Sequence, residues 1–205
     1  MTTKNVIKVL IADDHAIVRE GLKQILADTK DIVVAGDAEN GIEAIKLSRE
    51  GACQVLLLDI SMPDRSGIEV LKQVKKESPK IAVLMLSMHR EDKYAIRSLK
   101  AGASGYLNKQ SAPAELVNAI RQVAAGRKYI SAALAQELAN QISDDHETPL
   151  HETLSDREYQ TLTMIASGKT VSDIANELVL SVKTISMYRS RLLQKMKLRH
   201  NAELT

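Results

Sequence analysis

Short apolar runs alternate with amphipathic helical segments over residues 7–125, and this alternation is what most constrains the fold. Each run is four to six residues long, which is typical of a buried strand. After the first run, Val18, Leu22 and Ile25 follow the spacing of one helix face. Strict alternation of this kind predicts a doubly wound, five-stranded parallel sheet of the α/β class. The runs lie at residues 7–12, 32–35, 55–58, 81–86 and 104–107.

Polar side chains stand at the ends of four of these runs. Asp13 and Asp14 follow the first run, and Asp59 follows the third. Ser87 follows the fourth run, and Lys109 comes shortly after the fifth. The carboxyl ends of parallel strands meet at one edge of a sheet, where α/β folds bind their ligands. We therefore expect three carboxylates, one hydroxyl and one ammonium to meet there.

Three carboxylates in one place repel each other, so the group is costly unless a cation lies among them. Mg²⁺ suits this place because it takes oxygen ligands and bridges to phosphate. Its expected ligands are Asp13, Asp14, Asp59 and the backbone carbonyl of Ser61. A second oxygen of Asp59 would then be free to attack a phosphorus atom. Lys109 would neutralise the charge on the phosphoryl oxygens.

Each of these residues has a simpler explanation when it is taken alone. Asp14 would be the N-cap of a helix that begins at His15. Lys109 would be an ordinary loop lysine, and Ser87 a turn residue instead of a donor to a phosphoryl oxygen. His15 could be mistaken for a metal ligand beside Asp14, but a hard cation prefers oxygen ligands, so we assign it to the start of the helix. The occurrence of the whole set at successive strand ends favours the phosphoryl-binding site.

The chain beyond residue 126 predicts a second, all-helical domain. Ser155 and Glu158 form the S-x-x-E pattern of a capping box. Thr170 and Asp173 offer a second box, and Ser181 caps a longer, basic helix. Two helices joined by a short turn are typical of the helix-turn-helix motif. We expect the α/β domain at residues 1–126 and the helical domain at 152–205. The linker between them, 127–151, would contain a short helix at 131–142.

The distribution of charge indicates a nucleic-acid partner for this second domain. The net charge of the chain is only +2, but residues 181–200 contain six basic residues and no acidic one. This fits a contact with double-stranded DNA, and a solvated helix face is the alternative. Base edges would be reached by Lys183, Ser186 and Met187, and phosphates by Thr184, Tyr188 and Arg189.

Cysteine usage and hydropathy predict a soluble cytoplasmic protein. The single Cys53 excludes an intramolecular disulfide and fits a reducing compartment. No apolar run approaches the roughly 18 residues of a membrane span, and no secretory signal precedes Asp13.

Several motifs resemble those of a known family. Four stretches resemble the receiver domain of two-component response regulators: IADDHAIVREGL, LLLDISMPDRSGIEVL, LMLS and AGASGYLNK. One long stretch resembles a LuxR-type helix-turn-helix output: TLSDREYQTLTMIASGKTVSDIANELVLSVKTISMYRSRLLQKM. Their order resembles the NarL/FixJ subfamily, which implies a flavodoxin-like receiver with strand order 2-1-3-4-5.

The resemblance also implies roles for the residues at the strand ends. Asp59 would be the phosphoacceptor, with a sensor histidine kinase as donor, and Asp13 and Asp14 the Mg²⁺ acids. Ser87 would be the switch hydroxyl, and Lys109 the partner of the phosphoryl group. Tyr106 would be the rotating switch aromatic, and the resemblance allows a homodimer to form on activation.

The sequence departs from the family pattern in its output half. Ser186 and Ser172 stand where basic residues are common, so non-specific DNA affinity would be modest. The fourth output helix, which pairs two outputs in the family, would begin at 200–204 and is therefore expected to be incomplete.

The sequence favours a phosphorylation-controlled transcriptional regulator that is not an enzyme. An aspartyl-phosphate phosphatase would need a second aspartate where Ser61 stands, and a cap domain. A phosphorylation-independent DNA-binding regulator with a structural receiver is the alternative, but a structural domain has no need of the carboxylate cluster.

Overall fold

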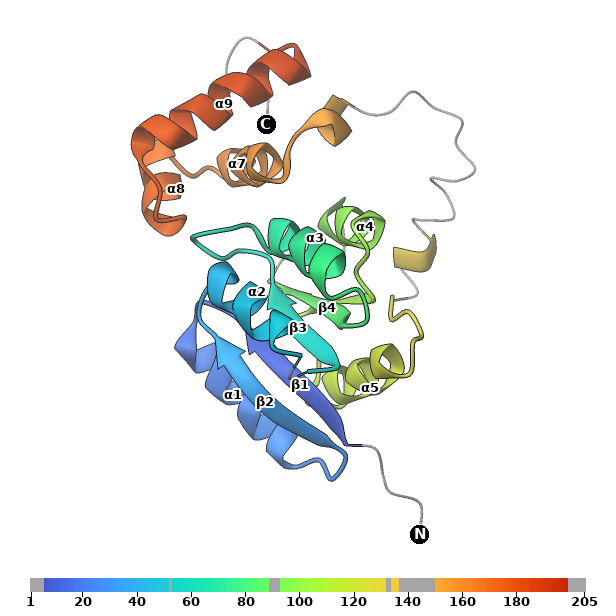
Figure 1. Cartoon of the computed structure of the whole chain (residues 1–205). Helices are drawn as coiled ribbons and strands as arrows, with labels where there is room; N and C mark the ends of the chain where they lie inside the picture. The colour runs from blue at the N-terminus through green and yellow to red at the C-terminus, as the bar shows by residue number, and fades with distance from the viewer. Residues whose placement is uncertain (1–5, 52, 89–92, 132–133, 137–149, 199–205) are drawn as a thin grey trace. The chain divides into compact units, whose positions relative to one another are not determined.

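The chain forms two compact units, Met1–Ile142 and Ser143–Thr205. The structure is a computed structural model that describes residues 6–51, 53–88, 93–131, 134–136 and 150–198 (Figure 1). Each unit is described by itself below.

The first unit is built on a parallel sheet. Its strands are β1 (Ile7–Ala12), β2 (Ile32–Ala38), β3 (Val55–Asp59), β4 (Ala82–Ser87) and β5 (Gly105–Asn108). The strand order is β2-β1-β3-β4-β5 and every pairing is parallel, which confirms the predicted fold. The order reverses direction at β1, so the carboxyl ends of β1 and β3 lie side by side at the switch point.

Helices cover both faces of this sheet (Figure 1). An apolar cluster that includes Ile11, Leu57, Leu86 and Ile120 packs α1 and α5 against one face. Ile68 and Leu71 are buried on α3, which lies with α2 and α4 on the other face. The bounds are α1 (Ala16–Ala27), α2 (Gly41–Arg49), α3 (Gly67–Glu77), α4 (Lys93–Lys100) and α5 (Pro113–Ala124).

Strand β2 is longer than the sequence predicts. The apolar pattern ends at Ala35, but the strand continues through Gly36 and Asp37 to Ala38. Gly36 pairs with Leu10 after a shift of register. Pairing with β1 therefore overrides the low strand preference of glycine and aspartate.

The second unit is helical and begins with a 3₁₀ turn, η1 (Leu150–Thr153). It continues with α7 (Asp156–Ala166), α8 (Val171–Glu177) and α9 (Val182–Met196). Both predicted capping boxes form, Ser155 with Glu158 and Thr170 with Asp173, and Ser181 caps α9. Ile174 of α8 and Ile185 and Leu192 of α9 are fully buried in the core of this unit.

Two predicted segments fall mainly or wholly outside the described residues. These are the short helix at 131–142, of which only 131 and 134–136 are described, and the helix start at 200–204. Within the described part of the chain, no helix has the length and apolar character that crossing a membrane requires.

Candidate functional site

One lysine and two aspartates from three strand ends meet at the carboxyl edge of the sheet. Asp13 follows β1, Asp59 ends β3, and Lys109 follows β5. The Lys109 ammonium lies 2.6 Å from Asp13 Oδ2 and 2.9 Å from Asp59 Oδ1. The backbone N–H of Lys109 also donates to the carbonyl of Ser87 over 2.8 Å, which fixes the lysine beside β4. Both aspartate side chains are buried and the Lys109 side chain is 9% exposed, so the contacts are largely shielded from water.

The electrostatics of this pocket favour an additional cation. Burial raises the pKa of Asp59; Lys109 opposes this shift, while the Asp13 carboxylate adds to it. Burial alone would lower the pKa of Lys109, but Asp59 and Asp13 outweigh it and the pKa is raised. Lys109 therefore remains protonated, and one ammonium only partly balances the neighbouring carboxylates.

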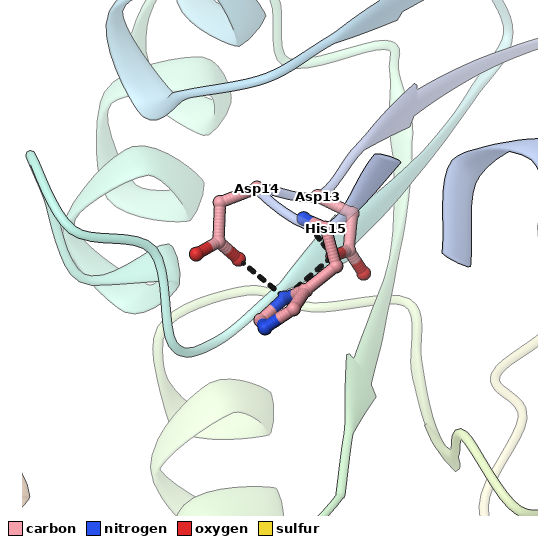
Figure 2. Close-up of side chains that lie close together, drawn as sticks. All are labelled: Asp13, Asp14 and His15. Atoms are coloured by element: carbon pink, nitrogen blue, oxygen red, sulfur yellow. Dashed lines mark hydrogen bonds and ion pairs between the residues drawn. The ribbon is translucent and has the colours of Figure 1, made fainter. Parts of the chain in front are cut away.

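Asp14 and His15 follow Asp13 directly at the end of β1. Figure 2 shows the His15 imidazole turned toward both acids, with Nδ1 2.9 Å from Asp14 Oδ1 and 3.3 Å from Asp13 Oδ1. The backbone N–H of His15 donates to Asp13 Oδ1 over 2.9 Å. His15 occupies the N-cap position of α1 without a side-chain cap bond. The alternative explanation of Asp14 as the helix cap is therefore wrong.

The oxygen atoms of the acid pair fit a hard divalent cation. Asp13 Oδ2 and Asp14 Oδ1 are both buried atoms. Their neighbours are the charged or basic nitrogens of Lys109 and His15. Buried carboxylates whose negative charge exceeds the positive charge around them are suited to bind a cation such as Mg²⁺.

Asp59 is held by the loop that follows it. Asp59 Oδ2 accepts the backbone N–H of Ser61 over 3.2 Å, so Ser61 lies next to the carboxylate. The N–H of Gly67 closes the loop by donating to the carbonyl of Ile60 over 2.8 Å. A Cβ atom at Gly67 would lie 2.0 Å from the Asp59 carbonyl oxygen, so only glycine fits there.

The two remaining residues of the predicted pocket are buried in neighbouring strands. Ser87 ends β4, and Tyr106 lies in β5 opposite Met85. Ser87 is 1% exposed and Tyr106 is fully buried. Tyr106 therefore occupies an inward position in this structure.

Sequence reasoning missed Asp64, at the tip of the same loop. Its carboxylate accepts the N–H groups of Gly41 and Ile42, each over 3.0 Å, at the start of α2. A cap supplied from a residue more than twenty positions away has no local sequence pattern, because capping signals are read within one turn.

The predicted DNA-contact residues lie along α9 in the second unit. Lys183, Ser186 and Met187 are exposed on one side of the helix. Thr184, Tyr188 and Arg189 are partly buried. The Thr184 hydroxyl lies 2.8 Å from Ser181 Oγ, so it contributes to the start of the helix.

Comparisons with known proteins agree with both units. Residues 9–121 match the response regulator receiver domain, and residues 152–205 match the bacterial regulatory proteins of the luxR family. The response regulator UvrY of Escherichia coli K12 is 40% identical over 200 residues, which cover 97% of this chain and 92% of UvrY. The response regulator GacA of Pseudomonas aeruginosa is also 40% identical over 200 residues, covering 97% of this chain and 93% of GacA.

A solved structure is also similar to this chain. It is RcsB of Salmonella enterica serovar Typhimurium, bound to the promoter rprA in the presence of the phosphomimetic BeF₃⁻. The match has a TM-score of 0.67 and 27% identity, and covers 98% of this chain and 96% of RcsB.

Proposed function

Because the chain belongs to the two-component response regulators of the NarL/FixJ family, with a receiver and a LuxR-type DNA-binding domain, we propose that phosphorylation of Asp59 controls it as a transcription factor. The observation that carries this proposal is the Lys109 ammonium, 2.9 Å from Asp59 and 2.6 Å from Asp13 in a buried pocket. A purely structural domain gains little from such a group, since buried charges are expensive.

The proposed reaction transfers a phosphoryl group from a phosphohistidine of a sensor histidine kinase. A carboxylate oxygen of Asp59 attacks the phosphorus atom; the new P–O bond forms, the P–N bond to the histidine breaks, and the imidazole takes the electron pair. Lys109 contacts a phosphoryl oxygen and offsets its charge. The Ser87 hydroxyl donates a hydrogen bond to the phosphoryl group after transfer.

The proposed cofactor is Mg²⁺. When bound, it supplies positive charge beside the phosphoryl oxygens and the attacking carboxylate. Asp13, Asp14 and Asp59 would hold it together with the backbone carbonyl of Ser61. The burial of Asp13 Oδ2 and Asp14 Oδ1, with a single lysine ammonium beside Asp13 Oδ2, supports this assignment.

The proposed signal passes from the pocket to the output. Ser87 and Tyr106 lie on adjacent strands and would shift together when Asp59 is phosphorylated. We place the receiver at 1–126, the linker at 127–151 and the output at 152–205. The activated protein would bind double-stranded DNA as a homodimer in the cytoplasm; the RcsB relative bound to a promoter supports the DNA part.

The proposed DNA contacts follow from exposure along α9. Lys183, Ser186 and Met187 are exposed and would reach base edges in the major groove. The apolar end of Met187 suits a thymine methyl group. Thr184, Tyr188 and Arg189 would contact phosphates and set the position of the helix.

Intact mass after incubation with acetyl phosphate tests the proposal. We expect a gain of one phosphoryl group that requires Mg²⁺ and is absent from the Asp59→Asn variant. If the folded wild-type protein gains no mass with Mg²⁺ present, the phosphoacceptor assignment is wrong. The receiver would then be a structural domain of a phosphorylation-independent regulator.

A further inference from the structure

The loop between β3 and α3, residues 60–66, places the backbone N–H of Ser61 beside the Asp59 carboxylate, at 3.2 Å from Oδ2. The loop is closed at its base by the hydrogen bond from Gly67 to Ile60. At its far end, a capping box between Ser66 and Glu69 fixes the first turn of α3. Both ends are therefore held by hydrogen bonds to their own neighbours, and the position of the tip depends on what lies opposite it.

The tip of the loop is joined to α2 through Asp64. Asp64 Oδ1 accepts the N–H of Gly41 over 3.0 Å, and Oδ2 accepts the N–H of Ile42 over 3.0 Å. One carboxylate thus spans the first two N–H groups of α2. Its negative charge lies at the positive end of the helix dipole, which adds to the two hydrogen bonds.

Helix α2 has a local cap of its own. Asn40 accepts the N–H of Glu43 over 2.9 Å, and Glu43 accepts the N–H of Glu39 over 3.0 Å. This reciprocal pair is what the start of a helix usually needs. The bonds to Asp64 are additional to it, and they join α2 to the phosphoacceptor loop.

Gly41 allows the close approach that these bonds require. A Cβ atom at this position would lie 2.6 Å from Val70 Cγ2 and 3.2 Å from the Cβ of Arg65. The backbone of α2 is therefore packed directly against the loop and the first turns of α3. This packing makes the contact a short, inflexible link.

We propose that Asp64 is a positioning residue for phosphoryl transfer: its bonds to Gly41 and Ile42 hold the β3–α3 loop so that the Ser61 carbonyl is in place for the cation beside Asp59. This inference rests on the proposed function of Asp59. A loop that is already held loses less conformational freedom when the cation binds, so affinity and transfer rate both benefit.

The test compares two variants of the full-length protein. Asp64→Ala removes both bonds between the loop and α2, and Asn40→Ala removes the local cap of the same helix without touching the loop. Three readouts are taken on each folded variant. They are amide hydrogen exchange at Ser61 and Gly67, the Mg²⁺ concentration for half-saturation, and the rate of phosphorylation by acetyl phosphate.

We expect Asp64→Ala to accelerate exchange at Ser61 and Gly67 about fivefold, the factor that corresponds to a cap of about 1 kcal/mol. Mg²⁺ half-saturation should rise and the phosphorylation rate fall by a similar factor. Asn40→Ala should lower thermal stability to a comparable extent and leave all three readouts near the wild-type values. Asp64→Asn, whose single carbonyl oxygen can accept one of the two N–H groups, should lie between Asp64→Ala and the wild type.

The inference is overturned if both alanine variants change the loop equally, or if Asp64→Ala lowers stability and leaves the three readouts unchanged. Asp64 would then be an ordinary helix cap. If the wild-type protein takes up no phosphoryl group, the proposed function of Asp59 fails. Amide exchange and Mg²⁺ titration would still decide the role of Asp64.

Discussion

Two lysine–carboxylate contacts of the same length, one in each unit, show how burial changes the meaning of an ion pair. Lys109 lies 2.6 Å from Asp13 in the first unit, and Lys195 lies 2.6 Å from Glu158 in the second. The Lys109 side chain is 9% exposed and that of Lys195 is 41% exposed. The first pair is closed off from water, whereas the second has one end in solvent.

The difference extends to what surrounds each pair. Lys109 faces a second carboxylate, Asp59, and burial raises the pKa of that acid. Glu158 has a favourable environment: burial alone would raise its pKa, but Lys195 and the bonds from Ser155 outweigh it and the pKa is lowered. One contact lies between two buried carboxylates, and the other joins α9 to the start of α7.

The largest expected effect is that of Lys109→Met on stability. Removing the ammonium leaves Asp13 and Asp59 buried with no lysine between them, and breaking a buried pair in this way costs about 3 kcal/mol. Urea denaturation without Mg²⁺ measures the loss. Adding Mg²⁺ should recover part of it, because the ion replaces some of the missing positive charge. A loss no greater than that of Lys195→Met would show that burial does not distinguish the two contacts.

Asp59→Asn should act in the opposite direction. Since the pKa of Asp59 is raised in the folded state, its ionised form destabilises the fold at neutral pH, and a neutral amide removes that penalty. We expect the variant to be more stable than the wild type at pH 7 without Mg²⁺. The difference in stability between the variant and the wild type should narrow as pH falls through the raised folded-state pKa, because the wild-type Asp59 then also becomes neutral. Thermal unfolding across pH measures it, and a less stable variant at pH 7 would contradict the sign.

The two contacts also differ in how far the sequence could predict them. Ser155 and Glu158 are three residues apart, so their capping box is visible as a local pattern. The meeting of Asp13, Asp59 and Lys109 could be predicted only from the rule that parallel strands present their carboxyl ends at one edge. That rule places the residues together without specifying that Lys109 lies between the two acids.

Other features could not be predicted because they depend on non-local contacts. Asp64 caps a helix that begins 23 residues earlier, and no spacing in the sequence links the two. The last residues of β2 form a strand because they pair with Leu10 and its neighbours on β1, although glycine and aspartate have a low strand preference. Lys195 reaches Glu158 only because α9 packs beside α7, so the partner of the capping box was missed as well.

Glu158→Gln should have a smaller effect, and one that depends on pH. The wild-type pKa is lowered in the folded state, so the carboxylate stabilises the fold above the unfolded value of about 4.3 and loses this contribution as pH falls below it. We expect the variant to be about 1 kcal/mol less stable at pH 7. Thermal unfolding of both proteins should converge in acid. A difference that persists at low pH would indicate that the loss comes from packing.

Lys195→Met should have the smallest effect, below about 1 kcal/mol, because half-exposed ion pairs are screened by water and salt. The Lys195 ammonium also donates to the Thr153 carbonyl over 3.3 Å, a long bond that adds little. Raising NaCl from about 0.1 to about 1 M shortens the screening length roughly threefold and should reduce the difference between variant and wild type further. The same salt series should change the Lys109→Met difference much less, because salt screens buried ion pairs far more weakly than exposed ones. If both differences fall in parallel, salt screens the Lys109 contacts as strongly as it screens a surface ion pair, and burial does not distinguish the two.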